Sequence, residues 1–380
     1  MRFIHLSDLH LGKVVNGYSM IEDQERILNL IINFAHKYRV DAIVVAGDIY
    51  DKGVPTTEAV NLLDSFLYNA SKKGIYLYMI SGNHDSADRL NFGTSHFRKD
   101  NIFLSGRFEN KMDKYSYRDA YGKVNFYLLP YVKASTVRYY YPDEDIETYE
   151  DALRVVMEHA DVDETERNVI IAHQYVTGEK SDPSVSGSET VRPESVGTIE
   201  KISYEVFDRF DYAALGHIHS PQKIGRETVR YSGSPLKYSL REVDSRKSFP
   251  VVTLGKKGDV KIDLVKIKPK RDIRHLTGPI DEIIENAEDT EDYIYVTLTD
   301  EMAVPDAMSR IKAVYPNTMH VDYLKRDEYN PGEMEFEDPF EKRSFRQLIS
   351  GFYESMYDRE MSDEEWKIIS ELSEKAGIEK

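Results

Sequence analysis

The sequence contains no cysteine and only one tryptophan among its 380 residues. Without cysteine the protein has no disulfide, no cysteine-ligated zinc or iron–sulfur cluster, and no thiol nucleophile. No apolar stretch approaches the ~20 residues that a membrane-spanning helix needs, and Met1 leads directly into the strand-like FIHLSD rather than into a signal peptide. We therefore expect a soluble, cytoplasmic protein with no membrane partner.

An excess of positive charge is also lacking. The 67 Asp and Glu outnumber the 50 Lys and Arg, which gives a net charge of −17 at pH 7. This excludes a simple basic protein that coats nucleic acid by charge alone. The acidity is uneven, because residues 327–380 hold 16 acidic and 7 basic side chains. The net charge of the whole chain therefore does not exclude a local surface for nucleic acid within residues 1–326.

Short apolar runs alternate with amphipathic stretches over the first two thirds of the chain. This pattern is typical of an α/β or α+β sandwich. Apolar residues at helical spacing predict helices over residues 27–38 and 60–70. The predicted strands are Phe3–Leu6, Ala42–Ala46, Leu77–Ile80, Phe126–Leu129, Val169–Ala172, Tyr212–Leu215 and Val251–Leu254.

The composition changes near residue 268. Residues 256–274 hold eight Lys or Arg against three Asp, and a short β-α-β-α-β pattern follows, with a strand at Tyr293–Leu298 and a helix at Ala307–Val314. The C-terminal forty residues show two amphipathic helices, the second preceded by a capping-box pattern of Ser362 and Glu365. We predict a main domain of residues 1–268, a small domain of 269–326, an acidic linker of 327–340 and C-terminal helices in 341–380.

Five polar motifs follow predicted strands. At the end of an extended strand, residues i and i+2 point the same way, so two residues of one motif can converge on one centre. Glycines directly before three of the polar residues allow the backbone to turn sharply and approach closely. The motifs are Asp8-Leu9-His10, Gly47-Asp48-Ile49-Tyr50-Asp51, Gly82-Asn83-His84-Asp85, Ala172-His173-Gln174 and Gly216-His217-Ile218-His219.

These motifs together predict a metal centre. One of them alone is more often a surface or core residue than a ligand. Here five motifs occur in order, each at the end of a predicted strand, where ligands bind in open α/β sheets. A chance set of surface or core residues does not explain this arrangement. A carboxylate, imidazole and amide set without thiolate suits Mn²⁺, Fe²⁺ or Zn²⁺, and Mg²⁺ less well.

The ordered set D-x-H, G-D, G-N-H-D, H and G-H-x-H resembles that of the calcineurin-like metallophosphoesterases. The resemblance is closer to the SbcD family, the nuclease subunits of bacterial SbcCD complexes, and it covers essentially the whole chain. It implies an α/β (α+β) metallophosphoesterase β-sandwich flanked by helices, with a small α/β capping domain and C-terminal helices. The segments that carry it are MRFIHLSDLHLG, VAGDIYDKGVP, SGNHDSADRLNFG, ALGHIHSPQ, YSGSPLKYSLRE and RDIRHLTG.

The resemblance also implies two divalent metal ions, with Mn²⁺ preferred and Mg²⁺ as the alternative. Two such ions ~3.5–4 Å apart polarise phosphoryl oxygens and activate water. Asp48 would bridge the ions, and His84 would be the catalytic residue that stabilises the phosphoryl charge and protonates the leaving oxygen. The further ligands would be Asp8, His10 and His219 for one ion, and Asn83, His173 and His217 for the other.

Asp51 is a second catalytic candidate. It either orients His84 through a hydrogen bond or merely closes the turn before Gly53, and the residues leave both readings open. Archaeal and eukaryotic relatives tend to have a histidine here. Gln174 and Asp85 are expected to support the site or its turns rather than to bind an ion.

The implied activity is that of a DNA exonuclease and endonuclease in DNA repair, replication and recombination. The resemblance implies 3′→5′ exonuclease action on duplex ends, and endonuclease action on single strands and hairpins. The implied partners are DNA, a coiled-coil SbcC-type ATPase on which residues 341–380 dock, and a second copy of this chain, as a homodimer within a heterotetramer. Packing of the C-terminal helices on their own core is the alternative to docking.

Three further readings stay open. Residues 256–274, with Arg138–Tyr141, Arg226, Arg230 and Arg246, either contact DNA phosphates or are ordinary solvated and packed side chains. Leu62, Leu63, Phe66 and residues 90–97 serve either a dimer interface or the core. The alternative function is a stand-alone metallophosphatase or nucleotide phosphodiesterase of the same fold; the intact motif set disfavours a non-catalytic scaffold.

Overall fold

The computed structural model describes residues 1–178, 182–185, 201–324, 362, 366–367 and 369–370. Contacts divide the chain into one unit of Met1–Leu324 and another of Lys325–Lys380. In the second unit Trp366 is helical, and its amide donates to the Ser362 carbonyl at 2.9 Å. The whole predicted linker and nearly all of the predicted C-terminal helices, including Glu365, lie outside the described residues.

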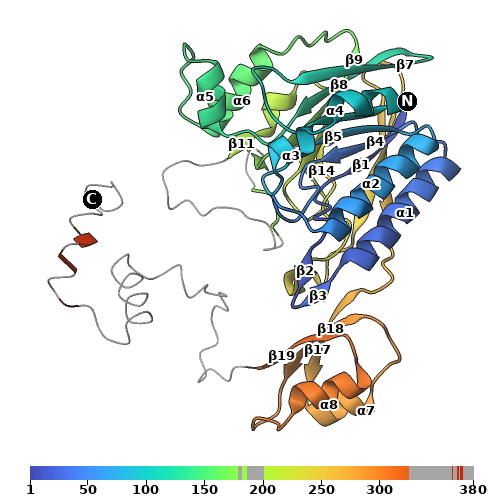
Figure 1. Cartoon of the computed structure of the whole chain (residues 1–380), viewed down its shortest axis with the longest axis vertical. Coiled ribbons are helices and arrows are strands. Elements are labelled where there is room, and N and C mark those ends of the chain that lie inside the picture. The colour runs from blue at the N-terminus through green and yellow to red at the C-terminus, as the bar shows by residue number, and fades with distance from the viewer. Residues whose placement is uncertain (179–181, 186–200, 325–361, 363–365, 368, 371–380) are drawn as a thin grey trace. The chain divides into compact units, whose positions relative to one another are not determined.

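The first sheet of the larger unit has six strands in the order β16-β15-β1-β4-β5-β6. Figure 1 labels three of its neighbouring strands, β1, β4 and β5. Strands β1, β4, β5 and β6 are parallel, whereas β15 pairs antiparallel with β1 and β16. The central strand is a continuous apolar run, AIVVA, as expected where both faces of a parallel strand are covered. The bounds are β1 Arg2–Leu6, β4 Ala42–Ala46, β5 Tyr76–Ile80, β6 Ile102–Ser105, β15 Ser248–Leu254 and β16 Val260–Lys266.

The second sheet also has six strands, in the order β13-β14-β12-β9-β8-β7. Its four inner strands are parallel, and β7 and β13 close the edges in antiparallel pairing. The carboxyl ends of the inner strands therefore lie along one edge. The bounds are β7 Asp113–Asp119, β8 Gly122–Leu129, β9 Arg167–His173, β12 Tyr212–Gly216, β13 Gln222–Ile224 and β14 Arg226–Tyr231.

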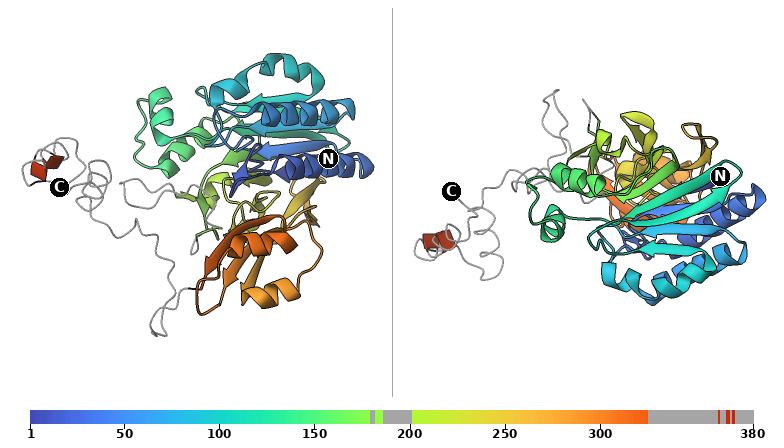
Figure 2. Two further views of the ribbon diagram at one scale, coloured as in Figure 1. Left: turned by 60° about the horizontal axis from the view of Figure 1, so that its bottom comes forward. Right: turned by 90° about the horizontal axis from the view of Figure 1, so that it is seen from above.

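The two sheets pack face to face through an aromatic core. Tyr78 and Phe126 stack with ring centroids 4.0 Å apart, and Phe3 meets Tyr212 edge-on at 5.6 Å. Helices α1 (Ile21–Lys37) and α2 (Thr57–Lys72) cover the outer face of the first sheet, and α5 (Ala134–Tyr140) and α6 (Tyr149–Glu158) that of the second (Figure 2). The result is a sandwich of two sheets between two helical layers.

Short elements complete this part of the chain, mostly in the connections at the edges of the sheets. They are β2 Val14–Val15, β3 Tyr18–Ser19, α3 Ala87–Asn91, α4 Thr94–Phe97, η1 Arg98–Asp100, β10 Val176–Thr177, β11 Ile202–Ser203, η3 Tyr204–Phe207 and η4 Leu240–Glu242.

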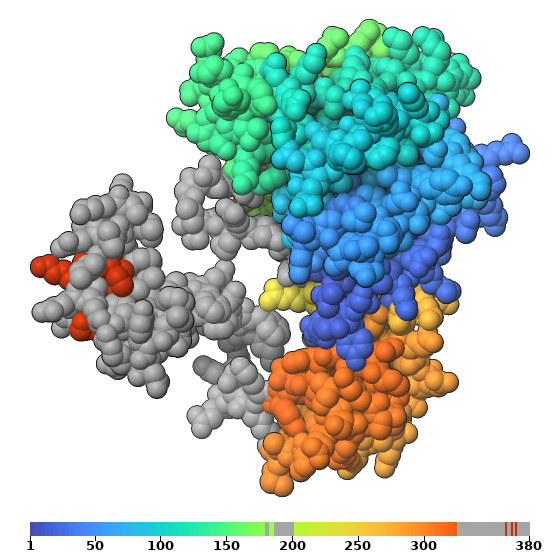
Figure 3. All heavy atoms as spheres, in the orientation of Figure 1, coloured from blue at the N-terminus to red at the C-terminus, as the bar shows by residue number. Residues whose placement is uncertain are grey.

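Three parallel strands and two helices form a smaller lobe (orange in Figures 1 and 3). Strands β17 (Ile273–Gly278), β18 (Tyr293–Leu298) and β19 (Thr318–Tyr323) pair in sequence order. Helices α7 (Ile280–Glu285) and α8 (Ala307–Val314) pack on them around a separate apolar core. This is the β-α-β-α-β order that the sequence predicts.

The small lobe contacts the sandwich at the first turn of α1 and the β2–β3 hairpin. The Arg271 guanidinium contacts both oxygens of the buried Asp23 carboxylate, at 3.0 and 3.1 Å from its Nε. The Tyr293 hydroxyl donates to the same carboxylate at 2.8 Å, and the Tyr18 hydroxyl donates to the Thr318 carbonyl at 3.0 Å. A charged, hydrogen-bonded contact therefore joins the lobe to the sandwich.

The predicted sandwich fold and each of its predicted strands are confirmed, with bounds shifted by a few residues. Helix α2 buries Leu62, Leu63 and Phe66 in the core of a single chain, whereas Val60 is 44% exposed. Burial in the core of the chain therefore accounts for these three residues without a dimer interface. Among the described residues, no helix combines the length and apolar character needed to cross a bilayer.

Candidate metal centre

All seven predicted ligands lie at the carboxyl ends of parallel strands in the two sheets: His173 is the last residue of β9, and the other six lie on the loops that follow β1, β4, β5 and β12. Because the two sheets pack with these ends at the same edge, the loops meet there. The Asp8 amide donates to the Gly47 carbonyl at 3.1 Å, and the His10 amide donates to the Asp48 carbonyl at 3.0 Å. The loops after β1 and β4 are thus joined backbone to backbone.

Four of these ligands have left-handed backbone conformations. The φ angles are 51° for Asp8, 44° for His10, 48° for Asp48 and 99° for His217. Such conformations cost of order 1–3 kcal/mol each in a residue with a side chain, and they gather at functional sites. The strained backbone lowers the local stability at this edge of the sandwich and places the ligand side chains close together, which marks the edge as a functional site.

Two glycines allow the loops to approach so closely. Gly47 has a φ of 84°, and a Cβ there would overlap the His173 ring. A Cβ on Gly82 would overlap the side chain and amide of Asp48. The loops therefore pack closely against the side chains of His173 and Asp48, as the glycines in these motifs predict.

The first ligand group consists of Asp8, His10 and His219, whose donor atoms lie within 4.8 Å of one another. All three are buried, and the Nε2 atoms of the two histidines face each other at 3.1 Å. Two imidazole nitrogens that bind one ion at about 2.1 Å, with about 90–110° between them, lie about 3.0–3.4 Å apart. The group therefore fits a divalent cation.

The second ligand group consists of Asn83, His173 and His217. The Asn83 Oδ1 atom lies 2.9 Å from His173 Nε2 and 3.1 Å from His217 Nδ1. The other ring nitrogen of His173 is 2.8 Å from the Ala46 carbonyl, which accepts the Nδ1 proton and leaves Nε2 directed at the centre. Asn83 is only half-buried, so this side of the centre faces solvent.

Asp48 lies between the two groups. Its Oδ2 atom is 3.6 Å from His10 Nε2 and 3.4 Å from His173 Nε2. Burial lowers the pKa of His173, but the charge of Asp48 outweighs burial and raises it to about 9. Burial raises the pKa of Asp48, but the surrounding imidazoles outweigh it and hold that pKa below its usual range. Asp48 thus faces both groups as a carboxylate.

His84 lies beside the centre, and its side chain is half-buried. Its amide donates to Asp48 Oδ1 at 2.9 Å, and its ring is edge-on to that of His10, with centroids 4.9 Å apart. The His84 Nδ1 atom lies 3.1 Å from the main-chain carbonyl of Asp51. The Asp51 carbonyl therefore accepts the proton on Nδ1 of His84.

Asp51 and His84 are joined by a hydrogen bond to the main chain of Asp51. The hydrogen bond goes to the Asp51 carbonyl, and the Asp51 carboxylate is 2.8 Å from Lys13 Nζ and 3.5 Å from His10 Nδ1. Burial raises the pKa of Asp51, but contacts with His10 and Lys13 outweigh it and lower that pKa. The turn thus contacts His84 through its backbone, and the catalytic role of Asp51 stays a prediction.

The two predicted supporting residues hold loops. Asp85 accepts the amides of Ile49, Tyr50 and Gly82 at 3.0, 2.8 and 2.9 Å, and its burial and the nearby Asp48 charge raise its pKa to about 6. Gln174 donates to the Val132 carbonyl at 3.1 Å.

Several supporting residues are absent from the sequence-based prediction. Gln24 of α1 donates to the His10 carbonyl at 2.7 Å and accepts the Gly12 amide at 3.0 Å, which fixes the loop after β1. Ser7 donates to Asp8 Oδ2 at 2.5 Å. Glu242 Oε1 lies 3.9 Å from His219 Nδ1. The only signal for Glu242 is its place in the family-like segment YSGSPLKYSLRE.

Comparisons with known proteins agree with this geometry. A family model described as calcineurin-like phosphoesterase matches residues 1–221, and one described as the type 5 capsule protein repressor C-terminal domain matches residues 269–357. The SbcD nuclease subunit of SbcCD from Staphylococcus epidermidis is 32% identical over 369 residues, which cover 95% of each chain. The chain belongs to the SbcD family of calcineurin-like phosphoesterases.

Membership of the SbcD family makes the chain a phosphoester hydrolase whose clustered His and Asp residues can bind divalent metals. A solved structure of a dimetal phosphatase from Danio rerio matches 71% of this chain and 97% of its own, at 11% identity and a TM-score of 0.40.

Proposed function

We propose that this SbcD-family chain is the DNA nuclease subunit of an SbcCD-type complex. It hydrolyses DNA phosphodiester bonds as a 3′→5′ exonuclease on duplex ends and as an endonuclease on single strands and hairpins. It acts in the cytoplasm in DNA repair, replication and recombination, as a homodimer with a coiled-coil SbcC-type ATPase. The relative named as a nuclease subunit supports this, since it matches over 95% of both chains.

The observation that carries the chemistry is the position of Asp48 Oδ2 between His10 and His173. We assign the first ion site to Asp8, His10, Asp48 and His219, and the second ion site to Asp48, Asn83, His173 and His217. Two bound divalent cations, Mn²⁺ by preference, would polarise the phosphoryl oxygens and supply an activated water. The buried carboxylates and imidazoles hold these positions before substrate arrives.

His84 acts on the substrate as general acid and electrostatic stabiliser. The Asp51 carbonyl keeps the proton on Nδ1, so Nε2 is the atom that carries the transferable proton to the leaving oxygen. Because the His84 amide is bonded to Asp48, the ring keeps a fixed place beside the ion sites. Such a residue contributes about 10²–10⁴-fold to rate.

The basic residues divide into two kinds. Arg226 donates to the carbonyls of Phe207 and Phe210, and the buried Arg230 pairs with Glu227, so these two hold loops. Arg138 and Arg246 are exposed, as is the Tyr139 side chain at 79%. The exposed residues are the better candidates for contacts with DNA phosphates and bases.

Cleavage of a linear duplex, labelled at either end, tests the proposal with Mn²⁺, Mg²⁺ or EDTA. We expect Mn²⁺-dependent shortening from the 3′ end, and none with His84→Ala prepared in the same way. If the chain stays inactive on DNA after an SbcC-type ATPase and ATP are added, but hydrolyses small phosphoesters, the alternative of a stand-alone phosphatase or nucleotide phosphodiesterase replaces it.

A further inference from the structure

A buried ion pair lies behind His219. Glu242 is fully buried and Lys247 is 6% exposed, and Glu242 Oε2 is 2.5 Å from Lys247 Nζ. Burying two charges costs desolvation energy that their attraction only roughly repays, so apolar residues in their place stabilise a fold as well or better. Stability alone therefore does not explain the pair.

The pair contacts both the ring and the main chain of His219. Glu242 Oε1 lies 3.9 Å from Nδ1 of the His219 ring, an ion-pair distance that needs to close by about 1 Å for a hydrogen bond. Lys247 Nζ donates to the His219 carbonyl at 2.9 Å and to Ser234 Oγ at 2.8 Å. One charged group thus fixes the backbone of His219 while the other faces its ring.

The placement of the carboxylate selects a tautomer. A negative charge on the Nδ1 side favours the proton on that nitrogen, which leaves a lone pair on Nε2. The Nε2 atom faces His10 Nε2 at 3.1 Å, in the first ion site. A histidine that binds a cation through Nε2 needs this tautomer and this orientation.

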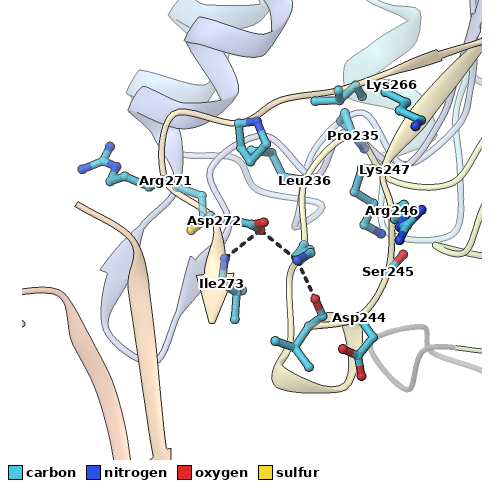
Figure 4. A pocket seen from close by; sticks show the side chains of 15 residues that line it. Pro235, Leu236, Asp244, Ser245, Arg246, Lys247, Lys266, Arg271, Asp272 and Ile273 are labelled. Atoms are coloured by element: carbon cyan, nitrogen blue, oxygen red, sulfur yellow. Dashed lines mark hydrogen bonds and ion pairs between the residues drawn. The ribbon is translucent and has the colours of Figure 1, made fainter. Parts of the chain in front are cut away.

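The loop that carries the pair borders a pocket on its other side. Residues 235–237 and 243–247 line a pocket of about 400 Å³ together with residues 266–273 (Figure 4). The pocket separates part of this loop from the segment that leads into β17. The loop is held on the pocket side by Lys237, whose Nζ lies 2.9 Å from Asp272 Oδ1, and on its inner side by the Tyr238 amide, which donates to Glu242 Oε1 at 3.2 Å.

We propose that Glu242, fixed by Lys247, is a positioning residue for His219. It keeps the proton on Nδ1 and directs Nε2 at the first ion site. This inference rests on the two-metal function proposed above. Partners of this kind behind a ligand histidine change metal affinity by about 10–100-fold when they are removed.

Titration of Mn²⁺ into the EDTA-stripped full chain tests the proposal, with calorimetry for affinity and electron paramagnetic resonance for ion pairing. We expect two Mn²⁺ per wild-type chain and a spectrum of two coupled ions. In Glu242→Gln one site should weaken about 10–100-fold, so that substoichiometric Mn²⁺ gives the spectrum of an isolated ion. The double variant Glu242→Gln/Lys247→Met leaves no unpaired buried charge and should lose the same site.

Asp119→Asn is the matched control, because it breaks an ion pair with the buried Arg167 at the opposite end of β9 from His173. We expect it to bind two Mn²⁺ like the wild type. Unchanged affinities in both Glu242 variants, or an equal loss in Asp119→Asn, would overturn the positioning role and leave the two-metal function standing. A wild-type chain that binds fewer than two Mn²⁺ would overturn the two-metal function, and this inference with it.

Discussion

A buried carboxylate strengthens the contact between the small lobe and the sandwich, and we predict that Asp23→Asn weakens this contact. Asp23 is 1% exposed and accepts from the Arg271 guanidinium and the Tyr293 hydroxyl. Asparagine keeps the shape of aspartate but removes its charge. Among the described residues, Arg271 would then keep the Tyr293 ring, whose centroid is 5.3 Å away, and an ion pair with Glu22, whose side chain is 73% exposed and therefore holds it weakly.

The size of the effect follows from these contacts. Breaking a fully buried ion pair costs about 3–5 kcal/mol, and a hydrogen bond to a charged group contributes about 1.5–3 kcal/mol. The Arg271 side chain is 16% exposed, so water can hydrate its guanidinium in the variant and reduce the free-energy cost of the broken ion pair. We expect Asp23→Asn to lower the free energy of unfolding by about 2–4 kcal/mol, and Tyr293→Phe by about 1.5 kcal/mol.

Urea unfolding of the full chain at pH 7, followed by far-ultraviolet circular dichroism with EDTA present, measures both variants without a contribution from bound metal. Glu288→Gln is the control in the same lobe, because its pair with Arg274 is exposed and contributes less than about 1 kcal/mol. The double variant should be less destabilised than the two single variants added together. The reasoning fails if Asp23→Asn costs no more than Glu288→Gln.

Three further variants test the centre and the sandwich. His84→Ala should reduce DNA cleavage about 10²–10⁴-fold while both Mn²⁺ still bind, since His84 is not a proposed ligand; loss of both ions would contradict its role. Asp48→Ala should lose both ions in calorimetry, and a variant that still binds two would refute the bridging position. Hydrogen bonds from Arg167 hold the pKa of Asp119 below its usual range, so its stabilisation is complete above about pH 4 and is lost as the pH falls further. Asp119→Asn should therefore be about 2 kcal/mol less stable at pH 7, with a smaller difference at pH 3; an equal difference at both pH values would argue against this pairing.

The sequence predicts the strands and the cluster of motifs well because both are local signals. A buried parallel strand is a short apolar run, and the polar residue that follows it lies at the carboxyl edge of the sheet. The order Asp8, Asp48, Asn83, His173, His217 therefore follows the order of the strands. No separate long-range information is needed to bring these residues to one edge.

The supporting contacts escape prediction because they join residues far apart in the chain. Gln24 occupies a helix position that periodicity cannot distinguish from a surface site, and it is buried only because the loop after β1 folds over it. Glu242 and Lys247 stand in a polar, turn-like stretch typical of an exposed loop. Arg226 and Arg230 illustrate the converse, since basic residues that suggest a DNA surface instead bind the Phe207 carbonyl and the nearby Glu227 carboxylate.

The two proposed ion sites differ in how far they depend on the small lobe. At the start of α1, Asp23 binds the lobe through Arg271, while the next residue, Gln24, binds the His10 carbonyl. Lys237 makes a second link, from Asp272 to the Val243 carbonyl beside Glu242.

Both histidines of the first ion site are thus supported by elements that also contact the lobe. His173 of the second site instead rests on the Ala46 carbonyl within the sandwich. A shift of the lobe would therefore change the separation of the His10 and His219 nitrogens before it changed the second site. On this argument, Asp23→Asn should weaken Mn²⁺ binding at the first site and spare the second.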